Sequence, residues 1–267
     1  RDIRPVRKFA TFTEDLHRLA DWLMACSIKT VAMESTGVYW IALFQILESR
    51  GLEVCLVNAR HIKGVPGRKT DIQDCQWLQY LHSVGLLRGS FRPAEAVCAV
   101  RSILRHRDNQ LKSASRQVLL MQKALTQMNL QLHNVISDIT GVSGLAIIDA
   151  ILSGEREPSK LSCLCDARIK ASRQTVAKTL VGDYRPEHLF SLQQALESYR
   201  HFENQIAACD QHIERMLAHF DSQEQCAQAP STKYKSQGNQ PTFDAPSEMH
   251  RILGVDLTAI PGLSAQA

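Results

Sequence analysis

Two patterns of apolar residues divide the chain, and the first covers about the first 92 residues. Short apolar runs predict three strands, at residues 6–11, 30–34 and 53–57. Longer patterns with helical spacing predict three helices, at residues 13–26, 38–50 and 72–84. Because a helix separates the second and third strands, we expect these two strands to be parallel, joined by a right-handed crossover.

The second pattern is a heptad repeat that begins at Val97. One apolar row contains Val97, Leu104, Leu111, Val118, Leu125, Leu132 and Ile139. A second row, three residues further on, contains Val100, Ala114, Met121, Met128 and Val135, and only Arg107 interrupts it. The pattern predicts one long helix that ends at Gly141, and residues 192–220 repeat it. Two such helices could pair as an antiparallel hairpin or between chains.

The remaining residues predict a linker and the start of another domain. Residues 223–247 are rich in Gln, Ser, Pro and Ala, which is typical of a linker. An apolar helix is predicted at 249–257, and the Ile-Pro-Gly-Leu that follows it resembles the hairpin of a helix–hairpin–helix, whose N–H groups bind phosphate. The predicted divisions are a catalytic domain at 1–92, a coiled-coil oligomerisation region at 93–226, a linker at 227–248 and a further domain beginning at 249–267.

Charge and composition add a candidate partner. The net charge is only +4, but positive charge is concentrated in two places. One is the loop that contains Arg60, Lys63, Arg68 and Lys69, and the other is the first part of the long helix, which includes Arg101 and Arg105. Such clusters suit a polyanion, although a solvated helix face explains the second one equally well. The eight scattered cysteines, the lack of a signal peptide and the lack of an apolar run of membrane length predict a cytoplasmic protein with reduced thiols.

Three acidic residues form the candidate catalytic site. Glu34 ends a predicted strand, and the carboxyl edge of such strands is where open α/β sheets bind ligands. Asp71 and Asp74 are three residues apart at a predicted helix start, so their side chains share one face. Three carboxylates from two elements suit Mg²⁺ shared with phosphate. The alternative is structural, with Asp71 capping the helix and Asp74 favourable in its first turn.

Three motifs together resemble the bacterial DEDD transposases, the recombinases of the one-ten insertion-sequence family. They are Val-Ala-Met-Glu-Ser-Thr-Gly-Val-Tyr-Trp at 31–40, Lys-Thr-Asp-Ile-Gln-Asp at 69–74 and Leu-Thr-Ala-Ile-Pro-Gly-Leu at 257–263. They occur in the family's order, and the likeness extends over essentially the whole chain. The resemblance implies an α/β fold: a ribonuclease-H-like domain similar to Holliday-junction resolvases and incomplete at its N-terminus, then a long helical coiled coil and the start of a helical transposase domain.

The resemblance also implies the activity, the cofactor and the partners. A family member exchanges DNA strands, directed by a guiding RNA that the element encodes, and it uses Mg²⁺ at an Asp-Glu-Asp-Asp tetrad. Glu34, Asp71 and Asp74 match three members of that tetrad, whereas Asp2 does not match the first. No serine of this chain, Ser264 included, matches the nucleophilic serine. We therefore expect a fragment truncated at both ends that forms a homo-oligomer through the coiled coil.

Three further interpretations stay open at this point. The chain could be a nucleic-acid-binding remnant, and the resemblance predicts that it is inactive on its own because the first Asp and the nucleophilic Ser are absent. It could be a metal-dependent junction nuclease, which shares the acidic site and needs no serine. It could also act only as a structural dimeriser through its coiled coil.

Overall fold

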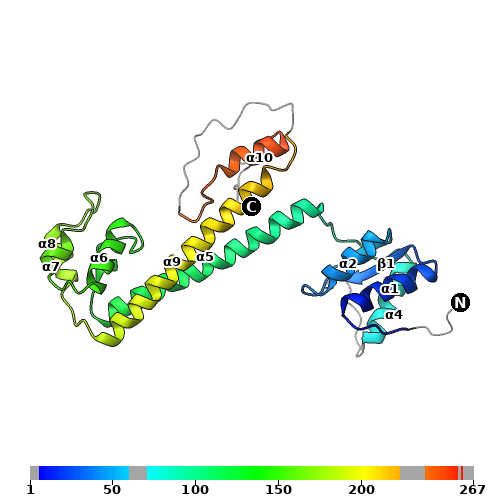
Figure 1. The fold of residues 1–267 in the computed structure, drawn as a ribbon, viewed down its shortest axis with the longest axis horizontal. Coiled ribbons are helices and arrows are strands. Elements are labelled where there is room, and N and C mark those ends of the chain that lie inside the picture. Colours follow the sequence, from blue (N-terminus) through cyan, green and yellow to red (C-terminus); the bar gives the residue numbers. More distant parts are fainter. Residues whose placement is uncertain (1–5, 60–70, 223–237, 258–259, 261–267) are drawn as a thin grey trace. The chain divides into compact units, whose positions relative to one another are not determined.

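The computed structural model describes residues 6–59, 71–222, 238–257 and 260. These residues form a mostly helical protein with a small sheet, and the chain divides into two compact units, residues 1–93 and 94–267 (Figure 1). The described elements of the first unit are α1 (Thr13–Ala25), β1 (Thr30–Glu34), α2 (Trp40–Ser49), β2 (Glu53–Val57) and α4 (Asp71–Ser83). Those of the second are α5 (Glu95–Gln127), η1 (Leu132–Asn134), α6 (Val142–Leu152), α7 (Pro158–Ser162), α8 (Arg173–Thr179), α9 (Pro186–Leu217) and α10 (Ala245–Leu253).

The first unit has a two-stranded parallel sheet at its centre. β1 and β2 pair from Thr30 opposite Glu53 to Glu34 opposite Val57, so the two predicted strands and their parallel pairing are confirmed. The buried residues of its core are Ala20 of α1, Met33 of β1, Phe44 and Leu47 of α2, Leu56 of β2, and Leu52, which lies between α2 and β2. Glu34 therefore stands at the carboxyl edge of a strand whose position is fixed by this core.

The strand predicted at residues 6–11 is wrong, because this segment packs against a helix instead of joining the sheet. The ring of Phe9 lies 5.6 Å from the ring of Trp22 in α1. The guanidinium of Arg7 lies over both rings, 4.9 Å from the centre of Phe9 and 5.5 Å from that of Trp22. These contacts partly cover the Phe9 ring, and residues 6–11 form no strand.

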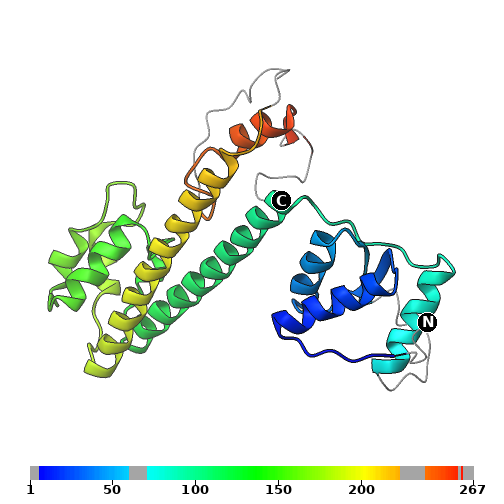
Figure 2. The same cartoon turned by 45° about the vertical axis from the view of Figure 1, so that its right-hand side comes forward.

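The second unit is built on a hairpin of two long helices. α5 and α9 lie side by side in both views (Figures 1 and 2). Met121 near the end of α5 shares a core with Leu192 near the start of α9, whereas Val100 near the start of α5 shares one with Ile213 near the end of α9. The helices are therefore antiparallel within one chain, which is the first of the two predicted pairings.

The long helix ends earlier than predicted, at Gln127 instead of near Gly141. Asn129 has a left-handed backbone with φ of 56°, and the chain reverses there. Leu132 and Ile139 of the heptad row are still buried, but in the core of the short helices α6–α8. The heptad spacing correctly predicted that Leu132 and Ile139 are buried. They are buried by packing with α6–α8, and not as part of one long helix.

Part of the segment predicted as a linker packs on the hairpin. Phe243 and Ala245 are buried beside Val100 and Ile213. α10 then begins, with the Asp244 carboxylate accepting a hydrogen bond from the Ser247 N–H at 3.1 Å. No helix in the described part of the chain is long and apolar enough to cross a membrane.

Candidate active site

Glu34 lies at the start of a turn that several hydrogen bonds hold in place. The N–H and hydroxyl of Ser35 both donate to the Val57 carbonyl, at 2.9 and 3.2 Å. Gly37 has φ of 56°, a left-handed conformation that glycine adopts without strain. The Thr36 hydroxyl donates to Glu34 Oε1 at 2.6 Å. Residues 34–37, Glu-Ser-Thr-Gly, therefore both form the turn and restrain the Glu34 carboxylate.

The other two predicted acids lie in the first turn of α4. This helix begins at Asp71, one residue before its predicted start, and both Asp71 and Asp74 are exposed. Their negative charges are favourable at a helix N-terminus. α4 packs beside β1, and His82 at its far end bonds the Thr30 hydroxyl at 3.0 Å. The contact with β1 brings the start of α4 to the same part of the unit as Glu34.

Glu34, Asp71 and Asp74 line one cleft of about 920 Å³. Its apolar wall includes Val31 and Met33 of β1. Among the described residues, however, no three His, Cys, Asp or Glu side chains are close enough to hold one metal ion. The three predicted acids thus line one cleft, but in the described structure their carboxylates do not meet at a single metal position.

The cleft also contains two residues that the sequence did not single out. Thr36 lines it while bonding Glu34, and Arg7 also lines it and carries a positive charge. The signal for Thr36 was its place two residues after Glu34 in the turn. Arg7 gave no comparable signal, because its segment was predicted as a strand.

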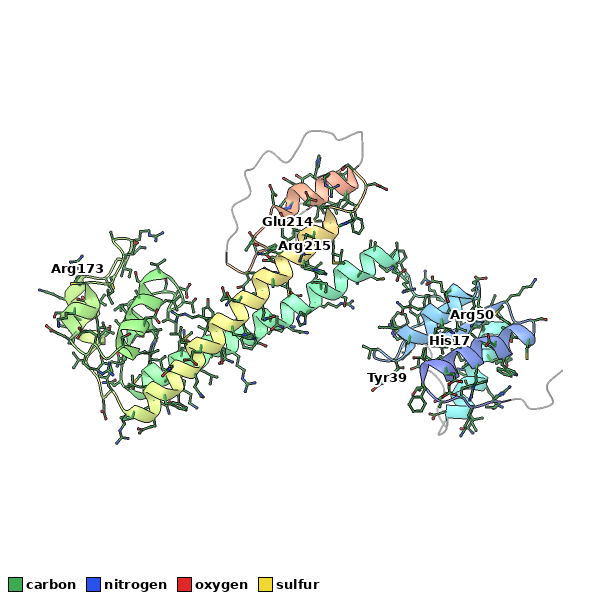
Figure 3. All side chains as sticks on the ribbon, viewed as in Figure 1. His17, Tyr39, Arg50, Arg173, Glu214 and Arg215 are labelled. Atoms are coloured by element: carbon green, nitrogen blue, oxygen red, sulfur yellow. The ribbon has the colours of Figure 1, made fainter. Side chains whose placement is uncertain are left out.

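Two exposed side chains of this unit, Tyr39 and Arg50, do not line the cleft. Tyr39, five residues after Glu34, projects away from the ribbon and is 86% exposed (Figure 3). Arg50 lies close to His17 in the same view and bonds both His17, at 3.4 Å, and Asp21 (Figure 3). The pairing of Arg50 joins α1 to the end of α2, so this cation supports the fold and not the cleft.

The predicted nucleic-acid-binding residues divide into two groups. Arg60, Lys63, Arg68 and Lys69 lie outside the described residues, as does most of the Leu257–Leu263 motif. Arg101 and Arg105 are exposed on α5, one helical turn apart, in the second unit. Neither forms an ion pair with another residue that the structure describes.

Comparison with known protein families finds a match over the first part of the chain. A family model described as a transposase matches residues 4–130, which include all three acids and the whole of α5. Over these residues, just under half of the chain, the sequence is similar to the DEDD transposases of the IS110 family. No curated protein matches the chain.

Proposed function

We propose that this protein is a transposase that cuts and exchanges DNA strands at the cleft formed by Glu34, Asp71 and Asp74. The observation that carries the proposal is that three acids chosen from sequence motifs, on two elements, line the same cleft. A strand end and a helix start that converge in this way can bring carboxylates to a scissile phosphate. We also propose that the first unit, residues 1–93, has a ribonuclease-H-like fold.

The donor chemistry of the cleft fits a divalent metal ion. Carboxylate oxygens are the ligands that Mg²⁺ prefers, and the ion usually completes its shell with water and substrate phosphate. One or two carboxylates at a time are then enough, which agrees with three acids spread around a cleft. A bound Mg²⁺ would act as a Lewis acid on the phosphoryl oxygen. Glu34, Asp71 and Asp74 would hold it.

Other residues of the cleft would position the reacting groups. The Thr36 hydroxyl restrains one oxygen of Glu34, which limits the rotamers of that carboxylate. Arg7 supplies the positive charge that a phosphate needs beside three acids. The stacking of Arg7 on Phe9 and Trp22 holds the guanidinium in place. The chain's own residues therefore provide both metal ligands and a phosphate contact.

We also infer the partners. DNA and the element's guiding RNA would bind to exposed cations, among them Arg101 and Arg105, and to Arg60, Lys63, Arg68 and Lys69. A homo-oligomer would form through the helical hairpin. In α5, one heptad row is fully buried against α9, whereas Val97, Leu104, Leu111 and Val118 of the other row are only partly covered. A second hairpin could bury that row.

A nucleic-acid-binding protein without catalysis is the second candidate. The observation that favours it is that the described acids do not converge on one metal position. Both candidates predict DNA binding. Only the transposase predicts chemistry that depends on a divalent ion, so metal dependence separates them.

The test compares Glu34→Gln and Asp74→Asn with Glu53→Gln, which removes an exposed carboxylate from β2 outside the cleft. Mn²⁺ binding followed by electron paramagnetic resonance, and Mg²⁺-dependent cleavage of linear and branched DNA, are the readouts. We expect both cleft variants to lose metal binding and cleavage while the control keeps them. DNA binding without metal-dependent cleavage by the unaltered protein would overturn the transposase proposal. Cleavage restricted to branched DNA, without strand exchange, would indicate a junction nuclease instead.

A further inference from the structure

A row of basic side chains runs along one face of α5. Its members are Arg101, Arg105, Lys112, Arg116 and Lys123, and all five are exposed. At 100° per residue, they fall within an arc of about 60° around the helix axis. The residues buried against α9, among them Val100, Arg107 and Met121, occupy a different side of α5. This basic face therefore points away from the hairpin partner.

The basic face carries more positive than negative charge. None of its five residues forms an ion pair with another described residue, and Asp108 is the one acid in the sequence between Arg101 and Lys123. Other exposed arginines of the same unit do pair: Arg200 with Asp149 at 2.6 Å, and Arg168 with Asp166 at 2.9 Å. The basic face thus keeps a local excess of about four positive charges along α5.

The dimensions and composition of this face point to a particular partner. At 1.5 Å per residue, Arg101 and Lys123 are about 33 Å apart along the axis, close to one turn of duplex DNA. α5 is one unbroken helix from Glu95 to Gln127, so this face can lie along a rigid polyanion. Unpaired bases are usually held by stacking on aromatic rings, and α5 contains no Phe, Tyr or Trp. These features favour a duplex backbone over a single strand.

We infer that the basic face of α5 binds the phosphate backbone of double-stranded nucleic acid, independently of sequence. The inference rests on the proposed function for the nature of the partner. It extends the contact from Arg101 and Arg105 along the helix to Lys112, Arg116 and Lys123. Lysine and arginine contacts to phosphate position a protein on a duplex and supply affinity, without reading bases.

The experiment measures the affinity for a mixed-sequence duplex at several salt concentrations. The test variant is Lys112→Gln, Arg116→Gln, Lys123→Gln. The matched control is Lys160→Gln, Arg185→Gln, Arg200→Gln, which removes the same charge from residues of the same unit that form ion pairs. Helical content and melting temperature, measured by circular dichroism, establish that both variants fold.

We expect the test variant to flatten the slope of log affinity against log salt by about 3, because each lost phosphate contact removes about 0.9. The control should retain the parental slope. Equal slopes for both variants would overturn the inference, as would a larger loss for single-stranded than for duplex DNA. Glu34→Gln should keep duplex affinity and lose cleavage, whereas the test variant should lose duplex affinity. A wrong inference about the basic face and a wrong proposal about the cleft would therefore give different results.

Discussion

Arg107 binds Asp210 inside the helical hairpin, with its guanidinium donating to both carboxylate oxygens. Arg107 is 3% exposed and Asp210 1%, so the two charges face each other almost without solvent. Arg107 also donates to the Asn239 carbonyl at 3.0 Å, and the Thr242 N–H donates to Asp210 at 3.1 Å. The residue that interrupts the heptad row therefore joins α5, α9 and the segment before α10.

Removing either partner of this pair should strongly destabilise the second unit. Arg107→Met leaves the Asp210 carboxylate buried without its counter-charge, and we expect a loss of about 3–5 kcal/mol in the free energy of unfolding. The double variant Arg107→Met, Asp210→Leu should lose much less, because no charge remains buried. Urea unfolding monitored by circular dichroism measures both. A double variant as unstable as the single one would show that the pair acts through packing alone.

Gly182→Ala should destabilise the turn that follows α8. A Cβ at this position would lie 2.2 Å from the Met128 carbonyl oxygen, far inside contact distance. The backbone would have to move, and we expect a cost of about 1–3 kcal/mol. The shift should also weaken the hydrogen bond from the Asp183 N–H to the same carbonyl, now 2.9 Å long. Gly89→Ala is the control, since its nearest neighbour, the Cys55 sulfur, is 3.7 Å away. Equal melting temperatures for the two variants would contradict the close approach.

Thr36→Val should weaken metal binding at the cleft without changing the fold. The substitution keeps the shape of the side chain and removes the hydroxyl that donates to Glu34. Loss of such a supporting hydrogen bond typically lowers metal affinity by about 10- to 100-fold. Thr36→Ser, which restores a hydroxyl, should recover most of it. The measurement is Mn²⁺ titration of each variant. Parental affinity in Thr36→Val would mean that the hydrogen bond does not orient the ligand.

Thiol alkylation should separate the cysteines of the second unit. Burial raises the pKa of the Cys209 thiol, with the nearby Asp210 carboxylate contributing. Less thiolate is then present at pH 8, and the side chain is only 8% exposed. Cys163 is exposed and should react with iodoacetamide before Cys209, as followed by mass spectrometry. Raising the pH should increase the alkylation rate of Cys209 less than partial unfolding in urea does. Reaction of Cys209 at the rate of Cys163 in the folded protein would contradict its burial.

Much of the fold could be predicted from local sequence. The β1 and β2 strands and helices α1, α2 and α4 match their predicted ranges to within two residues. The heptad rows predicted two long helices, and the three acidic residues that now share a cleft were chosen from the spacing of carboxylates around a strand end and a helix start. Such features follow from periodicity and turn chemistry over a few residues, which the sequence records directly.

Tertiary structure decided the remaining points. The chain after the end of α5 is held by Asp183, whose N–H donates to the Met128 carbonyl. The packing of residues 6–11 on α1 and the burial of Phe243 against the hairpin likewise depend on residues of other segments. Apolar spacing shows that Leu132 is buried, but not which helix buries it. The polar Arg107 shows no sign in sequence of its match with Asp210, 103 residues away. Periodicity reports whether a side chain is buried, whereas only packing determines what buries it.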